Sequence, residues 1–429
     1  MLDRRALLCG AAGFAGTVAL GGCGDDPHAL TVFFQAAPEE ARVRRRIIDE
    51  FRRARPDIPV RVQLSGPDPQ QQILTYCAGG RCPDVLMTWE SYARFAELGV
   101  LHDLGPLVRQ DPGSAADLAA PLTETFRFRG GLYALPEQWA GVFLYYNTDL
   151  FAAAGRPAPP ARWSDTWTFA EFLDTAQALT VRDRDGRTSQ WGFADAWPVP
   201  RYSAAIFGMN NGGDWFTPPI GPTRTGIGEP RFAQGFQFYA DLAVRHRVAP
   251  SVADAESQSA IDLFGSGQAA MVLTGHWMYS TFTAVPGLNF DVTVLPVGPH
   301  GSTAKSDIGT TGLGIAASSP RKEQAWEFVK FATGPIGQTL AAGSGLFVPA
   351  ATTAVHSPEF AAAHRHIRNL EVLTGGPANS AHIPVSPAWA RVDAAFRRAS
   401  DRVLRGAADA DWFADGPAQE IDGLLRDSA

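Results

Sequence analysis

The chain has 429 residues, of which 45% are hydrophobic and only 19% charged. This composition excludes an intrinsically disordered chain, and at about 100–200 residues per domain the length predicts two or three domains. The 37 basic and 44 acidic side chains give a net charge of −7, so we expect no nucleic-acid partner, which would need a basic patch.

The first residues predict an export signal. Arg4 and Arg5 precede an uncharged stretch rich in Ala and Gly, which is milder than the strongly apolar segment of a spanning helix. The run Leu20-Gly21-Gly22-Cys23 resembles the bacterial lipobox, in which the cysteine sulfur becomes diacylated. We therefore predict a signal peptide over residues 1–22, lipidation of Cys23 and a location outside the cytoplasm, with the lipid anchor as the sole membrane attachment. An uncleaved anchor helix is the alternative, and the export route stays open.

Two cysteines remain in the mature chain beyond the predicted anchor. Cys77 and Cys82 flank two glycines, and in an oxidising compartment such a close pair can form a disulfide. A zinc site is the weaker interpretation, because no second cysteine pair or nearby histidine completes four ligands. A catalytic thiol is weaker still, so we predict a structural disulfide.

Strands and helices alternate in the first part of the mature chain. In chain order the hydrophobic pattern predicts a strand over 30–34, a helix over 39–55, a strand over 60–64, a helix over 70–76, a strand over 85–88 and a helix over 92–98. This alternation implies a parallel sheet with right-handed crossovers, and ligands of such sheets bind beyond the carboxyl ends of the strands. That geometry alone nominates Gln35, Trp89 and Glu90 as ligand contacts.

The remaining elements follow the same α/β pattern until a mostly helical C-terminal third. The prediction comprises a strand over 142–147, a capped helix over 168–179, a polar turn over 182–188, helices over 232–246 and 260–265, strands over 269–273, 290–295 and 313–317, and a helix over 322–333. The Gly- and Pro-rich region 212–230 is expected to be an ordered surface loop.

A series of short motifs between about residues 30 and 400 resembles family 1 of the extracellular solute-binding proteins, the carbohydrate-binding subunits of ABC importers. The most specific is Phe264-Gly-Ser-Gly-Gln-Ala-Ala-Met-Val-Leu-Thr-Gly275, with Trp277 just after it. The others lie in order at residues 83–86, 98–104, 132–136, 145–151, 295–299, 312–315, 325–331 and 345–349.

The resemblance implies an α/β, two-lobe periplasmic-binding-protein fold of type II, a clamp with hinge crossings and a helical C-terminal portion. We expect lobe 1 to comprise residues 23–140 and 297–345, and lobe 2 to comprise 141–296 and 346–429. The implied function is high-affinity binding of a sugar, whether a mono- or oligosaccharide or an amino sugar, and its delivery to the permease subunits of an ABC transporter. We expect a monomer without a cofactor.

The site follows from the chemistry of sugars, which expose apolar C–H faces and a rim of hydroxyl groups. Flat aromatic rings and polar side chains bind these two features. By the resemblance, Trp139, Trp197 and Trp277 form the stacking platform. The other candidates that the resemblance suggests are Glu137, Asn210, Asn211, Gly275, His276, Thr311, Gly312 and Phe347. For each candidate the alternative is a structural role, such as a core tryptophan, a turn at the two asparagines or a packed neutral histidine.

The main rival class is an enzyme. Glu90 and Glu137 could form the carboxylate pair of a glycosidase, but nothing in the sequence sets their separation. The Gly-Ser-Gly segments at 265–267 and 343–345 lack the strand–Ser–helix context of a nucleophile elbow. We therefore expect no enzyme and no catalytic or metal-binding residue. Two further hypotheses are a receptor for a glycerophosphodiester or a polyol, and a scaffold lipoprotein without a ligand.

The charge of the nominated residues leads to an expectation about the ligand. Glu90, Glu137, Asp195 and Asp214 are acidic, no lysine or arginine falls inside the nominated motifs, and Arg201 is the nearest cation. A buried anion needs cationic donors to offset its desolvation. We therefore expect anionic sugars to bind worst, and amino sugars to bind at least as well as their neutral parents.

Overall fold

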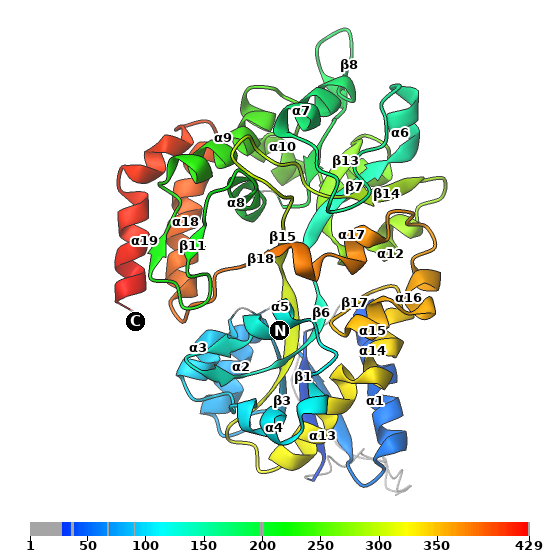
Figure 1. The fold of residues 1–429 in the computed structure, drawn as a ribbon, viewed down its shortest axis with the longest axis vertical. Helices are drawn as coiled ribbons and strands as arrows, with labels where there is room; N and C mark the ends of the chain where they lie inside the picture. Colours follow the sequence, from blue (N-terminus) through cyan, green and yellow to red (C-terminus); the bar gives the residue numbers. More distant parts are fainter. Residues whose placement is uncertain are drawn as a thin grey trace, which may run out of the picture.

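The computed structural model describes residues 28–35, 38–66, 68–89, 91–197, 199 and 201–427. The predicted signal peptide, Cys23 and Glu90 lie outside these residues. Two lobes, each built on its own β-sheet, lie one above the other in Figure 1, and slender connections join them near the middle. This arrangement confirms the prediction of a two-lobe α/β fold.

The first lobe contains a six-stranded sheet in the order β17-β6-β16-β3-β1-β2. Its strands are β1 (Leu30–Phe34), β2 (Val60–Leu64), β3 (Val85–Thr88), β6 (Leu135–Trp139), β16 (Thr310–Ile315) and β17 (Val348–Pro349). As predicted, β1, β2 and β3 are parallel, whereas β16 runs antiparallel to both β3 and β6. Around the sheet lie α1 (Pro38–Ala54), α2 (Pro69–Ala78), α3 (Tyr92–Glu97), α4 (Gly105–Gln110), η1 (Pro112–Ser114), α5 (Ala120–Thr125), the hairpin β4 (Arg127–Phe128) and β5 (Gly131–Leu132), α13 (Lys322–Thr333), α14 (Pro335–Ala342) and α15 (Thr352–Val355).

The second lobe contains a four-stranded sheet in the order β10-β13-β7-β14. Its strands are β7 (Val142–Asn147), β10 (Ala194–Asp195), β13 (Met271–Gly275) and β14 (Phe290–Thr293). Its other elements are α6 (Thr148–Ala153), α7 (Phe169–Ala178), the hairpin β8 (Val181–Arg182) and β9 (Thr188–Gln190), α8 (Arg201–Asn210), α9 (Pro230–Val244), α10 (Val252–Ser257), α11 (Ala260–Gly265), η2 (His276–Met278), α12 (Tyr279–Thr283), α18 (Trp389–Leu404), η4 (Ala410–Ala414) and α19 (Pro417–Arg426). The region expected as a loop over 212–230 contains a short hairpin of β11 (Phe216–Thr217) and β12 (Arg224–Thr225).

Local sequence explains why the helices begin and pack where they do. The Thr168 side chain accepts a hydrogen bond from the Glu171 backbone, and the Glu171 carboxylate accepts one from Thr168, which is the predicted capping box at the start of α7. In α1 the residues Val43, Ile48 and Phe51 share one buried face. Such faces pack each helix against its sheet. One buried cluster lies within the second lobe, whereas the other extends from the first-lobe sheet through Trp139 to Phe143 and Val292 of the second-lobe sheet.

The boundaries expected for the lobes are wrong in two places. The segment 297–305 stays with the second lobe, because the Asn210 side chain holds both backbone groups of Lys305 and the chain first joins the other sheet at β16. The segment after 346 begins in the first lobe, because β17 pairs with β6. It has reached the second lobe before β18 (Ser380–His382), because Asn369, between α16 (Pro358–Ala363) and α17 (Glu371–Thr374), donates to the Val292 carbonyl at 2.8 Å; η3 (Pro377–Asn379) follows α17. The motifs at 295–299 and 345–349 each lie within a lobe, so they did not locate the crossings.

Cys77 and Cys82 form the predicted disulfide between the end of α2 and the segment before β3. Replacing both cysteines by serine should lower the free energy of unfolding by roughly 2 kcal/mol, because the bond restricts a short loop in the unfolded chain. Urea unfolding of the oxidised wild type and the double variant measures the difference. Dithiothreitol should destabilise the wild type and leave the variant unchanged. Equal unfolding midpoints for the wild type and the variant would contradict this role.

Candidate ligand-binding cleft

Three segments run side by side between the lobes and form the hinge. The first joins β6 to β7 through Ala140 and Gly141, and the second is β15 (Ser306–Ile308). The third is β18, which pairs with β15 in parallel and therefore runs in the same direction. The Val142 backbone N–H donates to Asp307 Oδ1 at 2.9 Å, so the second crossing holds the first through a side chain. Burial raises the pKa of the Asp307 carboxyl to about 6.

Trp139 belongs to this hinge and not to an exposed platform, so that part of the prediction is wrong. Its side chain has no exposed surface, and its indole N–H donates to the Asp307 carbonyl at 3.1 Å. Gly141 and Gly376 lie against the ring so closely that a Cβ on either would overlap it. The indole therefore fills the space between the crossings and has no face free for a sugar.

Glu137 is also engaged inside the protein. Its two carboxylate oxygens accept hydrogen bonds from Arg44 of α1 at 2.6 and 2.9 Å, and Thr311 donates to it at 2.8 Å. The Arg44 guanidinium lies 4.7 Å from the centre of the Phe34 ring and 5.3 Å from that of Phe347. The predictions of Glu137 and Phe347 as ligand contacts are therefore corrected: both surround a buried arginine in the first lobe.

The two asparagines expected as sugar-binding amides are buried and bind the chain itself. Besides the Asn210 contacts with Lys305, the Asn211 amide donates to the Arg231 carbonyl at 2.7 Å. Both side chains are 1% exposed. Their role is to hold the segment before the second crossing and the start of α9 against α8.

His276 is a packed histidine, as the structural interpretation of this residue expected. It is 2% exposed, and its Nε2 lies 2.7 Å from Nε2 of His364, which follows α16. Burial lowers the pKa of both imidazoles, that of His364 to about 4, which favours their neutral forms. Gly312 and Gly275 each leave room for a neighbouring ring, of Phe126 and Trp277 respectively.

Trp197 and Trp277 are the two members of the predicted platform that the structure brings together. Both are half-buried, and their rings meet edge to face with centres 6.1 Å apart. They extend from neighbouring strands, because Trp197 follows β10, Trp277 follows β13, and these two strands pair in parallel.

Tyr202 and Trp389 form a second aromatic pair that packs on the same core of the second lobe as Trp197 and Trp277, and sequence reasoning missed both. Their rings lie 6.4 Å apart, and both are half-buried at the first turns of α8 and α18. Arg201 forms a double hydrogen bond with Asp393 at 3.0 and 3.1 Å, so its charge is neutralised within the lobe. We call Trp197, Tyr202, Trp277 and Trp389 the aromatic wall. The sequence signal for Trp389 was the Ser386-Pro387 pair before it, because such a pair often precedes the first turn of a helix.

Two cavities of about 430 and 410 Å³ open between the lobes and share Pro387. The first lies between Arg94 and Glu97 of α3 and Arg391 of α18. The second lies between the β4–β5 hairpin and the loop around Gly221. Each volume falls in the range of about 300–1,000 Å³ that small-molecule sites occupy. Ala388 and Ala390 both line the first cavity, so Trp389 lies at its edge.

The charge of this cleft differs from the expectation. Arg94, Arg127, Arg129 and Arg391 line the two cavities, although none falls in a motif that nominated the site. Asp195 accepts a hydrogen bond from the Tyr239 hydroxyl and is therefore engaged, like Glu137. Glu97 and Asp427 also line the first cavity, and Arg94 and Arg127 pair with Glu97 and Glu124, so the cleft is mixed in charge. The preference for amino sugars stays a prediction.

On the first lobe, Gln35 is exposed after β1 and Trp89 is half-buried after β3, where the strand-end rule placed them. Thr311 is also half-buried, and its hydroxyl is engaged with Glu137. Among the described residues, no three His, Cys, Asp or Glu side chains gather in a way that could hold a metal ion. The same described residues include no helix with the length and apolar character needed to cross a bilayer.

The chain belongs to the family of bacterial extracellular solute-binding proteins, since the model of that family matches residues 37–339. A putative binding protein of Brucella abortus is 22% identical over 305 residues, which are 69% of each chain. This membership confirms the resemblance on which the fold was predicted. The family and its structural neighbours are binding proteins and not enzymes.

Solved structures repeat the fold over nearly the whole chain. An ABC substrate-binding protein from Listeria monocytogenes, solved with cycloalternan, is 25% identical with a TM-score of 0.80 and covers 93% of this chain and 99% of its own. The GacH receptor of Streptomyces glaucescens, solved with acarbose, is 19% identical with a TM-score of 0.77, covering 94% and 99%. UgpB from Mycobacterium tuberculosis, solved with glycerophosphocholine, has the same identity and TM-score and covers 93% and 98%. At that identity, the last two show the fold alone.

Proposed function

We propose that this protein binds a sugar between its lobes outside the cytoplasm and delivers it to the permease subunits of an ABC importer. The observation that carries this proposal is the set of half-buried rings on the second lobe, of which Trp389 lies between Ala388 and Ala390, two residues that line a cavity shared by both lobes. Rings of this kind bind the apolar faces of sugars, and a ligand that contacts both lobes favours the closed clamp. The oligosaccharides in the Listeria and Streptomyces neighbours support the same ligand class.

A thermal-shift panel of neutral mono- and oligosaccharides, amino sugars and sugar phosphates tests the proposal. Binding to the folded state alone adds about 2.7 kcal/mol of stability at a hundredfold excess over the dissociation constant. We expect neutral sugars to raise the melting temperature. If no sugar in the panel does so, the proposed ligand class is wrong.

A glycerophosphodiester is the second candidate ligand, because arginines line both interlobe cavities, in the first beside Glu97 and Asp427, and a neighbour was solved with glycerophosphocholine. Arginine forms forked hydrogen bonds with phosphate, which a neutral sugar does not require. Glycerophosphocholine therefore belongs in the same panel. Its binding in place of the sugars would assign the cleft to this ligand.

We also propose that Cys23 is the lipidated N-terminus of the mature protein. Replacing Cys23 by alanine should release the protein from the membrane fraction, because two acyl chains provide stable attachment and the variant has none. Fractionation followed by immunoblotting measures the change, and a Cys9→Ala variant is the control, since Cys9 lies within the predicted signal. Membrane retention of the Cys23→Ala protein would contradict the anchor.

A further inference from the structure

Behind the aromatic wall, Asp195 connects the sheet of the second lobe to Trp197. It is the last residue of β10, where it pairs with Leu273 of β13. Its Oδ1 accepts a hydrogen bond from the Trp197 backbone N–H at 2.9 Å. The backbone of Asp195 is thus fixed in the sheet, and its carboxylate holds the backbone of Trp197 in the following loop.

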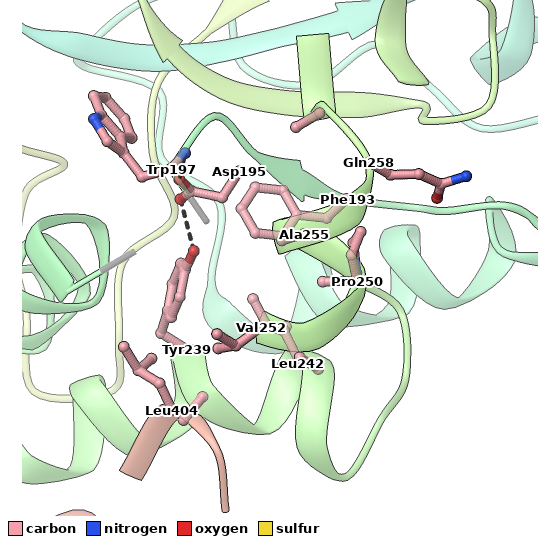
Figure 2. A pocket seen from close by; sticks show the side chains of 14 residues that line it. Phe193, Asp195, Trp197, Tyr239, Leu242, Pro250, Val252, Ala255, Gln258 and Leu404 are labelled. Atoms are coloured by element: carbon pink, nitrogen blue, oxygen red, sulfur yellow. Dashed lines mark hydrogen bonds between the residues drawn. The ribbon is translucent and has the colours of Figure 1, made fainter. Parts of the chain in front are cut away.

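The other oxygen of the carboxylate is held from the opposite side. The Tyr239 hydroxyl of α9 donates to Oδ2 at 2.6 Å, as the dashed line in Figure 2 shows. The Tyr239 ring is 5% exposed and packs edge to face on Phe193 and Phe207. Because the Tyr239 ring packs against both of these rings, its hydroxyl group is fixed in position. The hydrogen bond from this hydroxyl therefore holds the Asp195 carboxylate in one orientation.

The surroundings show that Asp195 is unsuited to bind the ligand directly. It borders a cavity of about 40 Å³ with apolar neighbours such as Leu242, Val252 and Leu404 (Figure 2). That volume admits water and is far below the roughly 300 Å³ of a small-molecule site. The carboxylate acts through the groups that it holds.

We propose that Asp195 is a positioning residue of the binding site: together with Tyr239 it fixes the backbone at Trp197, so that the Trp197 indole stays in edge-to-face contact with Trp277. The proposal rests on the proposed function, because it takes Trp197 to be a sugar contact. A tryptophan that is already ordered loses less conformational freedom when the sugar binds. Asp195 therefore raises the affinity without touching the sugar.

A double-mutant cycle with Trp197 tests this indirect action. Asp195→Ala should weaken binding of a sugar from the panel roughly tenfold, as expected for loss of hydrogen bonds to a charged group. In the Trp197→Ala background the same change should have no further effect, because the residue that it positions is gone. Asp195→Asn should restore the affinity to within about threefold, since its amide oxygen still accepts from the Trp197 N–H.

Near-ultraviolet circular dichroism gives a readout that does not need a ligand. The signal of the tryptophan pair should change in Asp195→Ala and stay as in the wild type in Asp195→Asn. Asp183→Ala is the matched control, because Asp183 Oδ1 also accepts from a backbone N–H two residues on, at 2.9 Å, in the distant β8–β9 hairpin. It should change neither the dichroism of the pair nor the affinity.

The results separate the two proposals. Equal weakening by Asp195→Ala with and without Trp197 would overturn the positioning role, as would unchanged affinity and dichroism in that variant. If Asp195→Ala does not fold, Tyr239→Phe replaces it in the cycle, with a smaller but equally non-additive effect expected. If no sugar binds the wild type, the proposed function fails, and the dichroism still decides the role of Asp195.

Discussion

Replacing Glu137 by alanine should lower the free energy of unfolding by about 3–5 kcal/mol, the range measured when one partner of a buried ion pair is removed. The side chains of Arg44 and Glu137 are 4% and 11% exposed, so water can replace little of the lost interaction. Burial lowers the pKa of the Arg44 guanidinium, whereas the charge and hydrogen bonds of Glu137 raise it. The net result is a raised pKa. Arginine keeps its charge in proteins, so in the variant Arg44 lies charged between two phenyl rings without the carboxylate that binds it.

Urea unfolding at pH 7 measures this loss. Glu50→Ala is the matched control, since Glu50 pairs with Arg53 on the exposed side of the same helix and exposed pairs contribute about 0–1 kcal/mol. Replacing Arg44 and Glu137 together by Met and Leu should recover most of the stability, because no unpaired charge remains. A Glu137→Ala protein as stable as the wild type, but weakened in sugar binding, would return Glu137 to the site.

The sequence predicts those parts of the fold that depend on residues close together in the chain, and it predicts less well those that depend on residues far apart in the chain. The strands β1, β2 and β3 and the helix α1 were predicted within a residue or so, because the alternation of apolar residues is local. The last crossing was misplaced, since β17 and β18 are both short and only pairing with distant strands shows to which part each belongs. Local periodicity does not contain that information.

The candidate site divides in the same way. The resemblance nominated Trp197 and Trp277 for one platform, and their rings are in contact because each follows a strand of one sheet. Glu137 was misjudged because its partner Arg44 lies 93 positions earlier in the chain, and no spacing rule connects them. Trp139 was misjudged for a similar reason: Gly376, which leaves the space for its ring, lies far along the chain between α17 and β18. The motifs located the crossing correctly but not the direction of its indole.

The largest effect on binding should come from the edge-to-face pair in the aromatic wall. Replacing Trp277 by alanine should weaken sugar binding roughly tenfold to a hundredfold, because the change removes a ring contact and the edge against which Trp197 lies. Trp197→Ala should act in the same direction and less strongly, since Trp277 still packs over Gly275. The two effects should not add, because the rings are in contact.

Isothermal titration of each variant with a sugar selected by the panel measures these losses. Trp412→Ala is the matched control: this half-buried tryptophan lies in η4 with the Arg402 guanidinium 4.4 Å from its ring centre, and it is not part of the aromatic wall. It should leave the dissociation constant unchanged. Circular dichroism at the titration temperature shows whether each variant is folded, since a half-buried ring contributes less to stability than a core residue such as Trp139. If Trp197→Ala and Trp277→Ala both bind like the wild type, the sugar contacts must lie on the first lobe, where Trp89 and Gln35 border the ends of β3 and β1.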